Sequence, residues 1–284
     1  MSITTTPTVT NESLDLRADM AFKARNRLAL RDLSEGLKLW PLAWKLGWLD
    51  IKLRYRGSML GPFWLTLSTG AMVAGLGLLY STLFKLDVHD YLPFISLSIV
   101  LWGFLSTMVS ESCAAFTEAE AIIRSVRMPF FVFSIRTVIR NILVLAHNIV
   151  VVVIVFAIFR LWPGWNGLYL IPALAVWIIN SLALTLLLGG FCTRFRDIQP
   201  IVNSVMQIAF FMTPVIWKPE QLGPRVFMLA ANPFYDMLEI VRAPLLGTSP
   251  GAIVWLATMA YSVALLAIAW AFFVHARRRV AFWL

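Results

Sequence analysis

The sequence predicts an all-α integral membrane protein with six transmembrane helices. Hydrophobic residues make up 60% of the 284 residues and charged residues only 14%, whereas charged residues alone account for about 25% of a typical soluble domain. The uncharged stretches are also long. No Asp, Glu, Lys or Arg occurs between Gly61 and Phe84, and a helix needs about 20 mostly apolar residues to cross a bilayer. The clustering of basic residues in alternate connections then gives the orientation.

Basic residues place both ends of the chain on one side of the membrane. Of the 24 lysine and arginine residues, 19 precede Gly61, lie between Arg124 and Arg140, or fall in the short segments around Arg194 and Arg277. Six crossings would put all of these segments on the same face. Because loops rich in Lys and Arg remain in the cytoplasm, we expect both termini to be cytoplasmic.

Three regions are expected along the chain: a polar N-terminal extension at 1–32, an amphipathic interface helix at 33–56 and a six-span domain at 57–284. The spans are expected at about 61–84, 91–110, 133–159, 168–192, 198–217 and 252–275. The mixed polar composition of the extension predicts loose order. It has no basic segment followed by an apolar core and a cleavage site, so no cleavable signal peptide is expected.

A basic, tryptophan-rich helix is predicted before the first span, with Pro41 restarting it. Its apolar stripe consists of Leu33, Leu37, Trp40, Trp44, Trp48 and Ile51, and its last basic residues are Lys52, Arg54 and Arg56. Indole rings favour the headgroup level and lysines favour anionic lipid. We therefore expect this helix to lie flat on the membrane; a soluble packing helix is the alternative.

Small residues in and before the first span permit close helix contacts. Gly57 and Gly61 form a GxxxG pair, and Gly70 with Ala74 repeats the spacing. This spacing lets two helix backbones approach, but small residues are common in spanning helices generally. Self-association through the first span stays an open alternative.

The connection after the second span predicts a short docking helix. Thr117 and Glu120 have the spacing of a capping box, and Pro129 disfavours helix at the residue before it. A helix of about ten residues at 118–127 is therefore expected, with Glu120 paired to Arg124 one turn later. Its candidate docking residues are Glu118, Glu120, Ile122, Ile123, Arg124 and Arg127. A solvated connector is the alternative.

Two further connections carry helix signals. Asp197 is placed to cap the fifth span. The loop between Trp217 and Ala252 is rich in proline yet apolar, and Asn232 with Pro233 supplies an N-cap and a first-turn proline. Two short helices are expected in this loop, re-entering the outer leaflet or packing against the bundle.

Motifs for catalysis and for ATP binding are missing from the sequence. It contains no Gly-x-x-x-x-Gly-Lys-Ser/Thr phosphate loop, and His89, His147 and His275 are far apart. We expect no metal, no cofactor and no enzyme activity in this chain. The net charge of +9 follows from membrane topology and does not indicate nucleic-acid binding.

The expected spans also lack the buried ionisable residues that ion-coupled pumps use. Glu111 comes nearest, and its position at the end of the second span favours an interfacial or capping carboxylate over a proton relay. Cys113 and Cys192 have no metal-ligand spacing and are interpreted as small buried apolar residues.

Several motifs occur in a fixed order along the chain. They are DIKLRYR at 50–56, LGPFW at 60–64, IIRSVRMP at 122–129, FRDI at 195–198, TPV at 213–215 and NP at 232–233. In this order they resemble the ABC-2 type permeases that export polysaccharides, the Wzm, KpsM and TagG group. The resemblance covers the chain from about Trp44 to its end.

The resemblance implies a transport permease that works as a homodimer with two copies of a separate nucleotide-binding ATPase, which would bind ATP and magnesium. It implies that the helix at 118–127 seats in a groove of the ATPase and that the amphipathic helix abuts it. ATP-driven closure of the ATPase pair would move both elements. The implied substrate is a polysaccharide, such as O-antigen or capsule, carried on a polyprenyl pyrophosphate lipid across the bacterial cytoplasmic membrane.

Aromatic rings suit such a cargo because they stack on sugar faces without requiring one sugar sequence. The candidates for a path lining are Trp102, Phe104, Phe210, Phe211, Trp217, Phe234 and Tyr235. Each of these rings can instead contact lipid or pack in the core.

Two other functions stay open. One is a related ABC-2 permease that exports drugs or small lipids and differs only in cargo. The other is a membrane transferase or polymerase acting on lipid-linked sugars, which would need acidic or histidine side chains converging at the outer face. Those available are Asp87, His89, Asp90, Glu220, Asp236 and Glu239.

Overall fold

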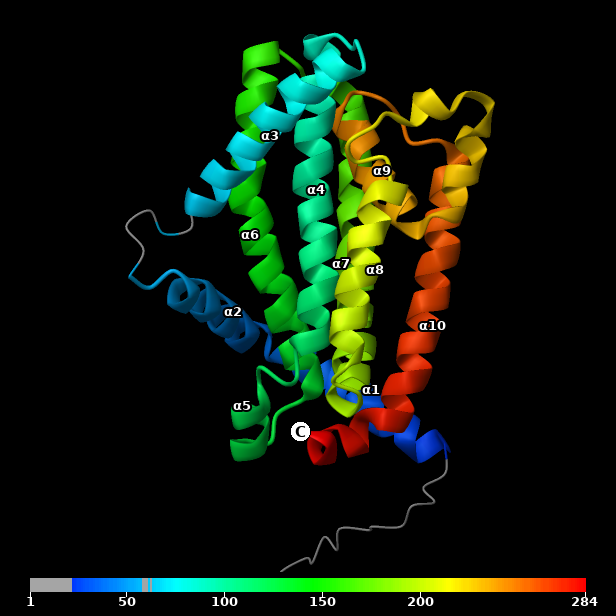
Figure 1. Ribbon diagram of the computed structural model, residues 1–284. Helices are drawn as coiled ribbons and strands as arrows, with labels where there is room; N and C mark the ends of the chain where they lie inside the picture. The colour runs from blue at the N-terminus through cyan, green and yellow to red at the C-terminus, as the bar shows by residue number, and fades with distance from the viewer. Residues whose placement is uncertain (1–21, 58–60, 62) are drawn as a thin grey trace, which may run out of the picture.

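The protein is a bundle of long helices with two helices crossing one of its ends (Figure 1). The computed structural model describes residues 22–57, 61 and 63–284, and all regular secondary structure within them is helical. Residues 1–21 of the expected extension, and positions 60 and 62 of the LGPFW motif, lie outside the described residues.

Helix α1 (Phe22–Lys38) begins well before residue 33, where the sequence predicted the first helix. Its buried residues are Ala29, Asp32 and Gly36. Residues 22–32 therefore belong to the packed structure, and the prediction of a loosely ordered extension up to residue 32 is wrong for this part. The sequence pattern did not predict this buried face, because its members are small or charged and do not form a hydrophobic stripe.

Helix α2 (Trp40–Arg54) follows after a break at Leu39, with a proline in its first turn, as predicted for Pro41. Its tryptophans, Trp40, Trp44 and Trp48, are 59%, 45% and 53% exposed, and its small residues face the bundle. Exposed indoles on a helix that crosses the bundle end suit a membrane surface (Figure 1). The membrane-surface location itself stays a prediction.

Five of the described helices are long and apolar enough to cross a membrane. They are α3 (Phe63–Leu83), α4 (Val88–Ala114), α6 (Phe130–Phe159), α7 (Leu170–Arg194, preceded by the 3-10 helix η1, Gly164–Tyr169) and α10 (Ala252–Trp283). Each lies where a span was expected. Helix α4 is central and contacts α3, α6, α7, α8 and α9.

The fifth expected span, 198–217, forms a helix of only 15 residues, α8 (Ile198–Met212), about 22 Å long at 1.5 Å per residue. Thr213 is extended, with φ −96° and ψ 138°, because a residue before proline avoids helical geometry. Pro214 thus ends the helix early and the chain continues without helix to the next element. The count of six spanning helices is not confirmed.

Asp197 does not cap α8 as the sequence predicted. Its backbone is helical, with φ −74° and ψ −14°. An N-cap residue needs extended backbone to turn its side chain onto the first free amides of the helix. The extended conformation occurs two residues earlier, at Phe195, with φ −127° and ψ 93°.

Two short elements precede the last long helix, as predicted. The 3-10 segment η2 (Pro219–Ala231) is kinked at Gly223, whose φ is +55°. The Asn232 side chain caps α9 (Pro233–Leu245) by accepting from the amides of Phe234 and Tyr235 at 3.0 and 3.4 Å. Helix α9 packs against α4, α7 and α10, so it belongs to the interior of the bundle.

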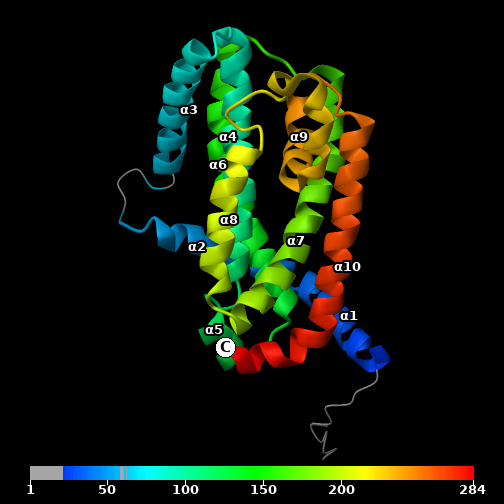
Figure 2. The ribbon, with the colours of Figure 1, turned by 45° about the vertical axis from the view of Figure 1, so that its right-hand side comes forward.

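Both described ends of the chain lie at the same end of the bundle. Figures 1 and 2 show α1, α5 (Glu120–Ser125) and the last turn of α10 together at one end, with the α3–α4 turn and η2 at the other. We call the first the basic end, because most lysine and arginine residues fall in its segments, and the second the far end. This shared placement agrees with an even number of passages through the bundle.

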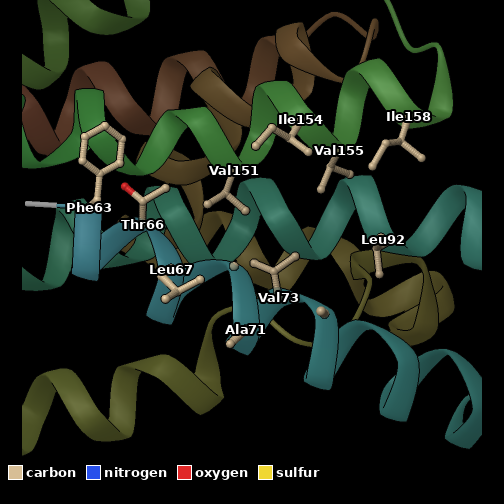
Figure 3. A pocket seen from close by; sticks show the side chains of 12 residues that line it. Phe63, Thr66, Leu67, Ala71, Val73, Leu92, Val151, Ile154, Val155 and Ile158 are labelled. Carbon is tan, nitrogen blue, oxygen red and sulfur yellow. The ribbon is translucent and has the colours of Figure 1, made fainter. Parts of the chain in front are cut away.

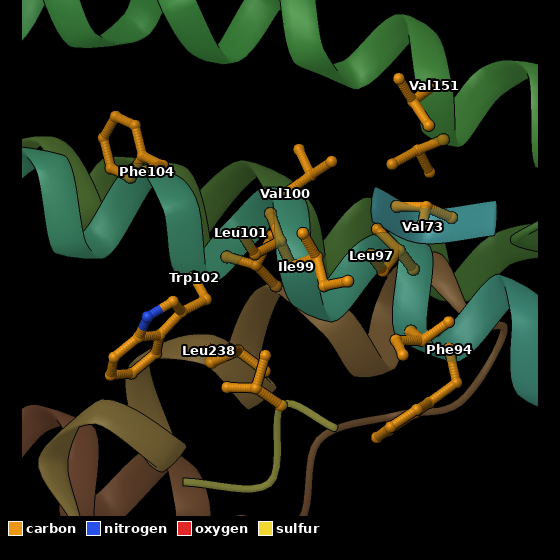
Figure 4. Close-up of a cluster of buried hydrophobic side chains, with 14 of the residues drawn as sticks. Val73, Phe94, Leu97, Ile99, Val100, Leu101, Trp102, Phe104, Val151 and Leu238 are labelled. Carbon is orange, nitrogen blue, oxygen red and sulfur yellow. The ribbon is translucent and has the colours of Figure 1, made fainter. Parts of the chain in front are cut away.

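Buried hydrophobic side chains form two clusters. One surrounds the first half of α4 and includes Tyr91, Phe94 and Trp102 (Figure 4). The other lies near the basic end, where Phe131 of α6 and Phe273 of α10 meet small residues of α1. The second cluster anchors α1 to the bundle and so fixes the surroundings of α5.

Glycines at 57 and 61 do not pack a helix interface. Their φ angles are +86° and +55°, which are conformations that glycine adopts readily, and no atom lies within 4 Å of a Cβ built there. The close contact of α3 is made instead by Gly77, where an added Cβ would lie 2.3 Å from Leu92. Self-association through the Gly70 and Ala74 spacing stays untested.

Candidate functional site

A helix exists where the docking helix was predicted, but it is shorter than expected. Helix α5 spans Glu120–Ser125, six residues instead of about ten, and projects at the basic end (Figure 1). The predicted pair of Glu120 and Arg124 is confirmed at 2.8 Å, with side chains 37% and 61% exposed. Of the remaining candidates, Ile122 and Ile123 pack against the second hydrophobic cluster, while Arg127 is exposed beyond the helix end.

The predicted capping box is wrong. The Glu120 amide bonds to the backbone carbonyl of Thr117 at 3.3 Å, and the Thr117 hydroxyl donates back to the carbonyl of Ala114 at 3.0 Å. The chain leaves α4 through tight turns. The Thr117 side chain therefore bonds to the last turn of α4 and does not cap α5. Glu118 lies outside α5 and accepts from Arg140 at 2.8 Å.

A charged network behind α5 centres on Glu111 near the end of α4. Its carboxylate accepts from Arg54 of α2 at 2.9 Å, and from Arg140 and Asn141 of α6 at 2.8 and 2.7 Å. Glu111 is thus the junction of three helices. This refines the predicted interfacial carboxylate and leaves no free oxygen for a proton relay.

Arg140 joins the same network from α6, and it is buried. Besides Glu111 it bonds to Glu118, and it lies 3.5 Å from Asp50 of α2. The prediction that the spans hold no buried ionisable residue is therefore wrong for α6, which begins at Phe130. Since a buried charge requires a partner, the three ion pairs with acidic side chains explain how Arg140 is tolerated.

A bidentate pair fixes α2 to α6. Arg136 donates to both carboxylate oxygens of Asp50, at 2.6 and 2.7 Å. Next to it, an added Cβ on Gly47 would lie 3.1 Å from the Arg136 carbonyl, so a larger residue there would have to push α2 and α6 apart by a few tenths of an ångström. The amphipathic helix is consequently attached rigidly to the helix that follows α5.

Asp32 holds α1 against the start of α6 and against α10. Its buried carboxylate accepts from the amides of Phe130 and Phe131 at 3.2 and 3.1 Å, and from Arg277 of α10 at 2.7 Å. An aspartate from another helix therefore caps the free amides at the start of α6. Sequence reasoning missed Asp32, because neither its spacing nor its neighbours show that it would reach residues a hundred positions away.

Three predicted aromatic residues meet in one cluster within the bundle. Trp102 of α4 lies 5.8 Å, between ring centroids, from both Phe210 of α8 and Phe234 of α9. Phe211 adjoins Phe210 at 5.2 Å and is 70% exposed. The indole of Trp217 donates to the Phe211 carbonyl at 3.2 Å, so these five candidates are contiguous.

Phe104 and Tyr235 lie away from that aromatic cluster. Phe104 stacks on Trp177 of α7 at 4.9 Å and 5°, and it leaves α4 on a different side from Trp102 (Figure 4). Tyr235 is buried. Within one chain, both rings therefore contribute to the core.

A cavity of about 790 Å³ lies between α3, α4 and α6. Figure 3 shows Leu67 and Val73 of α3 opposite Val151 and Ile154 of α6. The hydroxyl of Thr66, also in the lining, is engaged with the His147 carbonyl at 3.0 Å. Because a sugar needs polar groups to replace its water contacts, this apolar cavity does not suit a glycan.

The acidic and histidine candidates at the far end separate into two groups. His89, Asp90, Glu220 and Glu239 line one pocket of about 270 Å³. Asp236 is fully buried, with neither carboxylate oxygen bonded within the described residues. Burial, with the nearby charge of Glu239, raises the pKa of Asp236 to about 7.

The two cysteines are free thiols and both are buried, as predicted. They come from α4 and α7 and line the same small pocket near the start of α8.

The fold and this site define a helical, polytopic membrane protein with a short projecting helix and a charged junction at its basic end. The ABC-2 type transporter family matches residues 42–246, and the chain belongs to that family. It is a membrane permease of the ABC transporter class.

Curated relatives carry one shared description. The chain is similar to the O-antigen export system permease protein RfbA of Myxococcus xanthus, with 26% identity over 197 residues, 68% of this chain and 76% of the relative. Two Klebsiella pneumoniae proteins of the same description are 20% identical over 191 residues and 21% identical over 195 residues. Each alignment covers 66% of this chain and 74% of the relative.

Proposed function

We propose that this chain is the transmembrane subunit of an ATP-driven exporter that moves a polysaccharide, such as O-antigen, linked to polyprenyl pyrophosphate across the bacterial cytoplasmic membrane. The observation that carries the proposal is the similarity, over two thirds of the chain, to permeases described as exporting O-antigen. The matched segment 42–246 contains α5, the charged junction and the aromatic cluster.

The basic end would face the cytoplasm and receive the ATPase. Basic segments remain on the cytoplasmic side, and α5 with its exposed charged residues projects there. Two copies of a separate subunit would bind ATP and magnesium, because this sequence has no phosphate loop. The network of Asp50, Glu111 and Arg140 would carry a displacement of α5 to α2, α4 and α6.

A second copy of the chain would complete the path for the polymer. Helix α3 has only 11% of its apolar window buried, and Phe211 on α8 is 70% exposed, so both helices offer surface to a partner. The contiguous rings of Phe210, Phe211 and Phe234, backed by the buried Trp102, would present faces on which sugars of varied sequence can stack. This stacking would guide the polysaccharide through the path without binding it tightly.

Deletion of the gene tests the proposal directly. Cells should accumulate finished, lipid-linked polymer in the cytoplasm and lose it from the surface, and a plasmid copy should restore export. An ATPase partner inactivated at its phosphate-loop lysine should give the same accumulation. Loss of polymerisation, with only short glycans present, would instead indicate a transferase or polymerase, and unchanged surface glycan would indicate another cargo.

A further inference from the structure

The far end of the bundle holds a polar pocket that the export path described above does not use. The pocket has a volume of about 270 Å³ and lies where α4 begins, between the connection after α6, η2 and α9. Its polar lining includes Asp90, Lys218, Glu220, Glu239 and Arg242. These residues come from three segments far apart in the sequence, so only the folded chain creates the site.

The floor of the pocket is rigid. Arg242 is 1% exposed, and it donates to the Ser98 hydroxyl at 2.9 Å and to the Pro214 carbonyl at 2.6 Å. It also pairs with Glu239. Because these bonds tie α9 to α4 and to the end of α8, the floor keeps its shape without a ligand.

The rim, by contrast, holds charged groups that no described residue neutralises. Within the described part of the chain, Asp90, Lys218 and Glu220 form no ion pair within 4.0 Å, although they carry opposite charges around one cavity. Lys218 lies 5.9 Å from the centroid of the Phe94 ring. These donors and acceptors thus line one pocket without pairing with one another.

This arrangement matches a neutral, hydroxyl-rich ligand. A hydroxyl group both donates and accepts, so one ring of hydroxyls can satisfy carboxylates and an ammonium group together. An anion would meet three carboxylates against two cations. A metal ion is not favoured either, because the described residues contain no group of three or more acidic, His or Cys side chains placed to hold one.

The volume limits the ligand to about one ring. Pockets for drug-sized molecules usually measure about 300–1,000 Å³, and this pocket is slightly smaller than that range. We propose that this pocket binds a single sugar residue of the exported glycan as the glycan emerges at the outer face. This proposal rests on the proposed export function and adds a specific contact beyond the aromatic path.

A zwitterionic lipid headgroup is the rival occupant, because phosphate and ammonium groups could also use both signs of charge. The excess of carboxylates over cations favours hydroxyl donors over a phosphate. The two occupants can be separated with soluble probes that lack acyl chains.

Saturation-transfer NMR on the permease–ATPase complex in phosphatidylglycerol nanodiscs tests the site. The probes are oligosaccharides released by mild acid from the surface glycan of cells that make this protein, and glycerophosphoethanolamine for the lipid headgroup. The oligosaccharide signal should fall at least threefold in Lys218→Met and in Glu220→Gln. The matched control is Arg225→Met, an exposed residue of η2 outside the pocket lining, which should keep the full signal.

A second measurement does not depend on how a variant folds. Thr248 lies at the exposed rim, so Thr248→Cys can be purified, shown to bind, and then blocked with a polyethylene glycol maleimide. The signal should disappear on labelling and persist in the unlabelled sample.

Three results would overturn the proposal: no oligosaccharide signal, an equal signal in all variants, or a signal from glycerophosphoethanolamine in place of the sugar. Each differs from a failure of the export function. If the gene deletion still causes cytoplasmic polymer to accumulate while the NMR signal is absent, export stands and only the sugar site is wrong. If the deletion leaves surface glycan unchanged, the export function itself is wrong.

Discussion

Arg242 of α9 lies over the ring of Phe94 of α4, with its guanidinium carbon 4.5 Å from the ring centroid. The planar guanidinium can stack on the ring and still donate in its own plane. Its hydrogen bonds to Ser98, Pro214 and Glu239 use that plane. One side chain therefore fixes the short helix α9 between α4 and the non-helical continuation of α8.

Arg242→Met should destabilise the far end. The substitution keeps much of the apolar volume but leaves the Pro214 carbonyl and the Glu239 carboxylate without their donor, at a cost of about 2–3 kcal/mol. The thermal unfolding midpoint in detergent should fall accordingly, and Arg242→Lys should recover less than half of the loss. Arg225→Met is the control and should change stability by no more than about 0.5 kcal/mol. An unchanged midpoint for Arg242→Met would contradict the role assigned to this contact.

Glu111→Gln should weaken the junction of α2, α4 and α6. Its side chain is 18% exposed and lies between Arg54 and Arg140, so loss of its charge leaves buried Arg140 undercompensated, at a cost of about 3 kcal/mol. Thermal unfolding of the purified chain measures this loss. Glu35→Gln removes a more exposed carboxylate paired with Arg31 and should cost no more than about 1 kcal/mol. Equal effects of the two substitutions would show that the junction is not structural.

Reversal of the charges on α5 should separate docking from stability. Glu120→Arg combined with Arg124→Glu exchanges the two charges of an exposed pair, so the isolated permease should lose no more than about 0.5 kcal/mol. If α5 is the docking element of the proposed exporter, co-purification with the ATPase should fall at least tenfold, since the charges on the proposed contact surface are reversed. Full assembly with the ATPase and unchanged export would show that α5 is a simple connector and not a docking helix.

Asp236→Asn should stabilise the protein at alkaline pH. An unfolded aspartate titrates near 3.8 and the folded Asp236 near 7, so the folded state binds more protons between these values. Stability therefore falls as pH rises from about 4 to about 7, by an amount on the order of 4 kcal/mol at 1.36 kcal/mol per pH unit. The neutral asparagine avoids this loss.

Thermal unfolding of Asp236→Asn and of the unsubstituted chain, compared from pH 4 to pH 8, measures the effect. The two midpoints should agree near pH 4 and diverge progressively, by at least about 5 °C at pH 7 to 8. Asp87→Asn serves as a control at the exposed start of α4, where the side chain accepts from the His89 amide at 2.9 Å, and its offset at pH 8 should be smaller than that of Asp236→Asn. A constant offset for Asp236→Asn across the range would show that the carboxyl does not titrate there.

Local patterns predicted the elements whose causes are local. Long uncharged runs located the five long helices, and the Asn232–Pro233 signal located the start of α9. The pair of Glu120 and Arg124 followed from spacing within one turn. The early end of α8 at Pro214 was also a local signal, but the apolar run that continues through Trp217 outweighed it in the prediction of a full-length span.

The sequence by itself determined that this chain is a helical membrane protein, which segments of it are basic and where the short helix α5 lies, because hydropathy, charge and turn residues act over a few neighbouring positions. The tertiary structure alone decided that Asp32 caps α6, that Glu111 joins three helices, and that Asp90, Lys218 and Arg242 enclose one pocket. Those groups are separated by up to about 150 positions in the printed sequence. Their meeting depends on how the helices pack together, and no periodicity within a single segment encodes that packing.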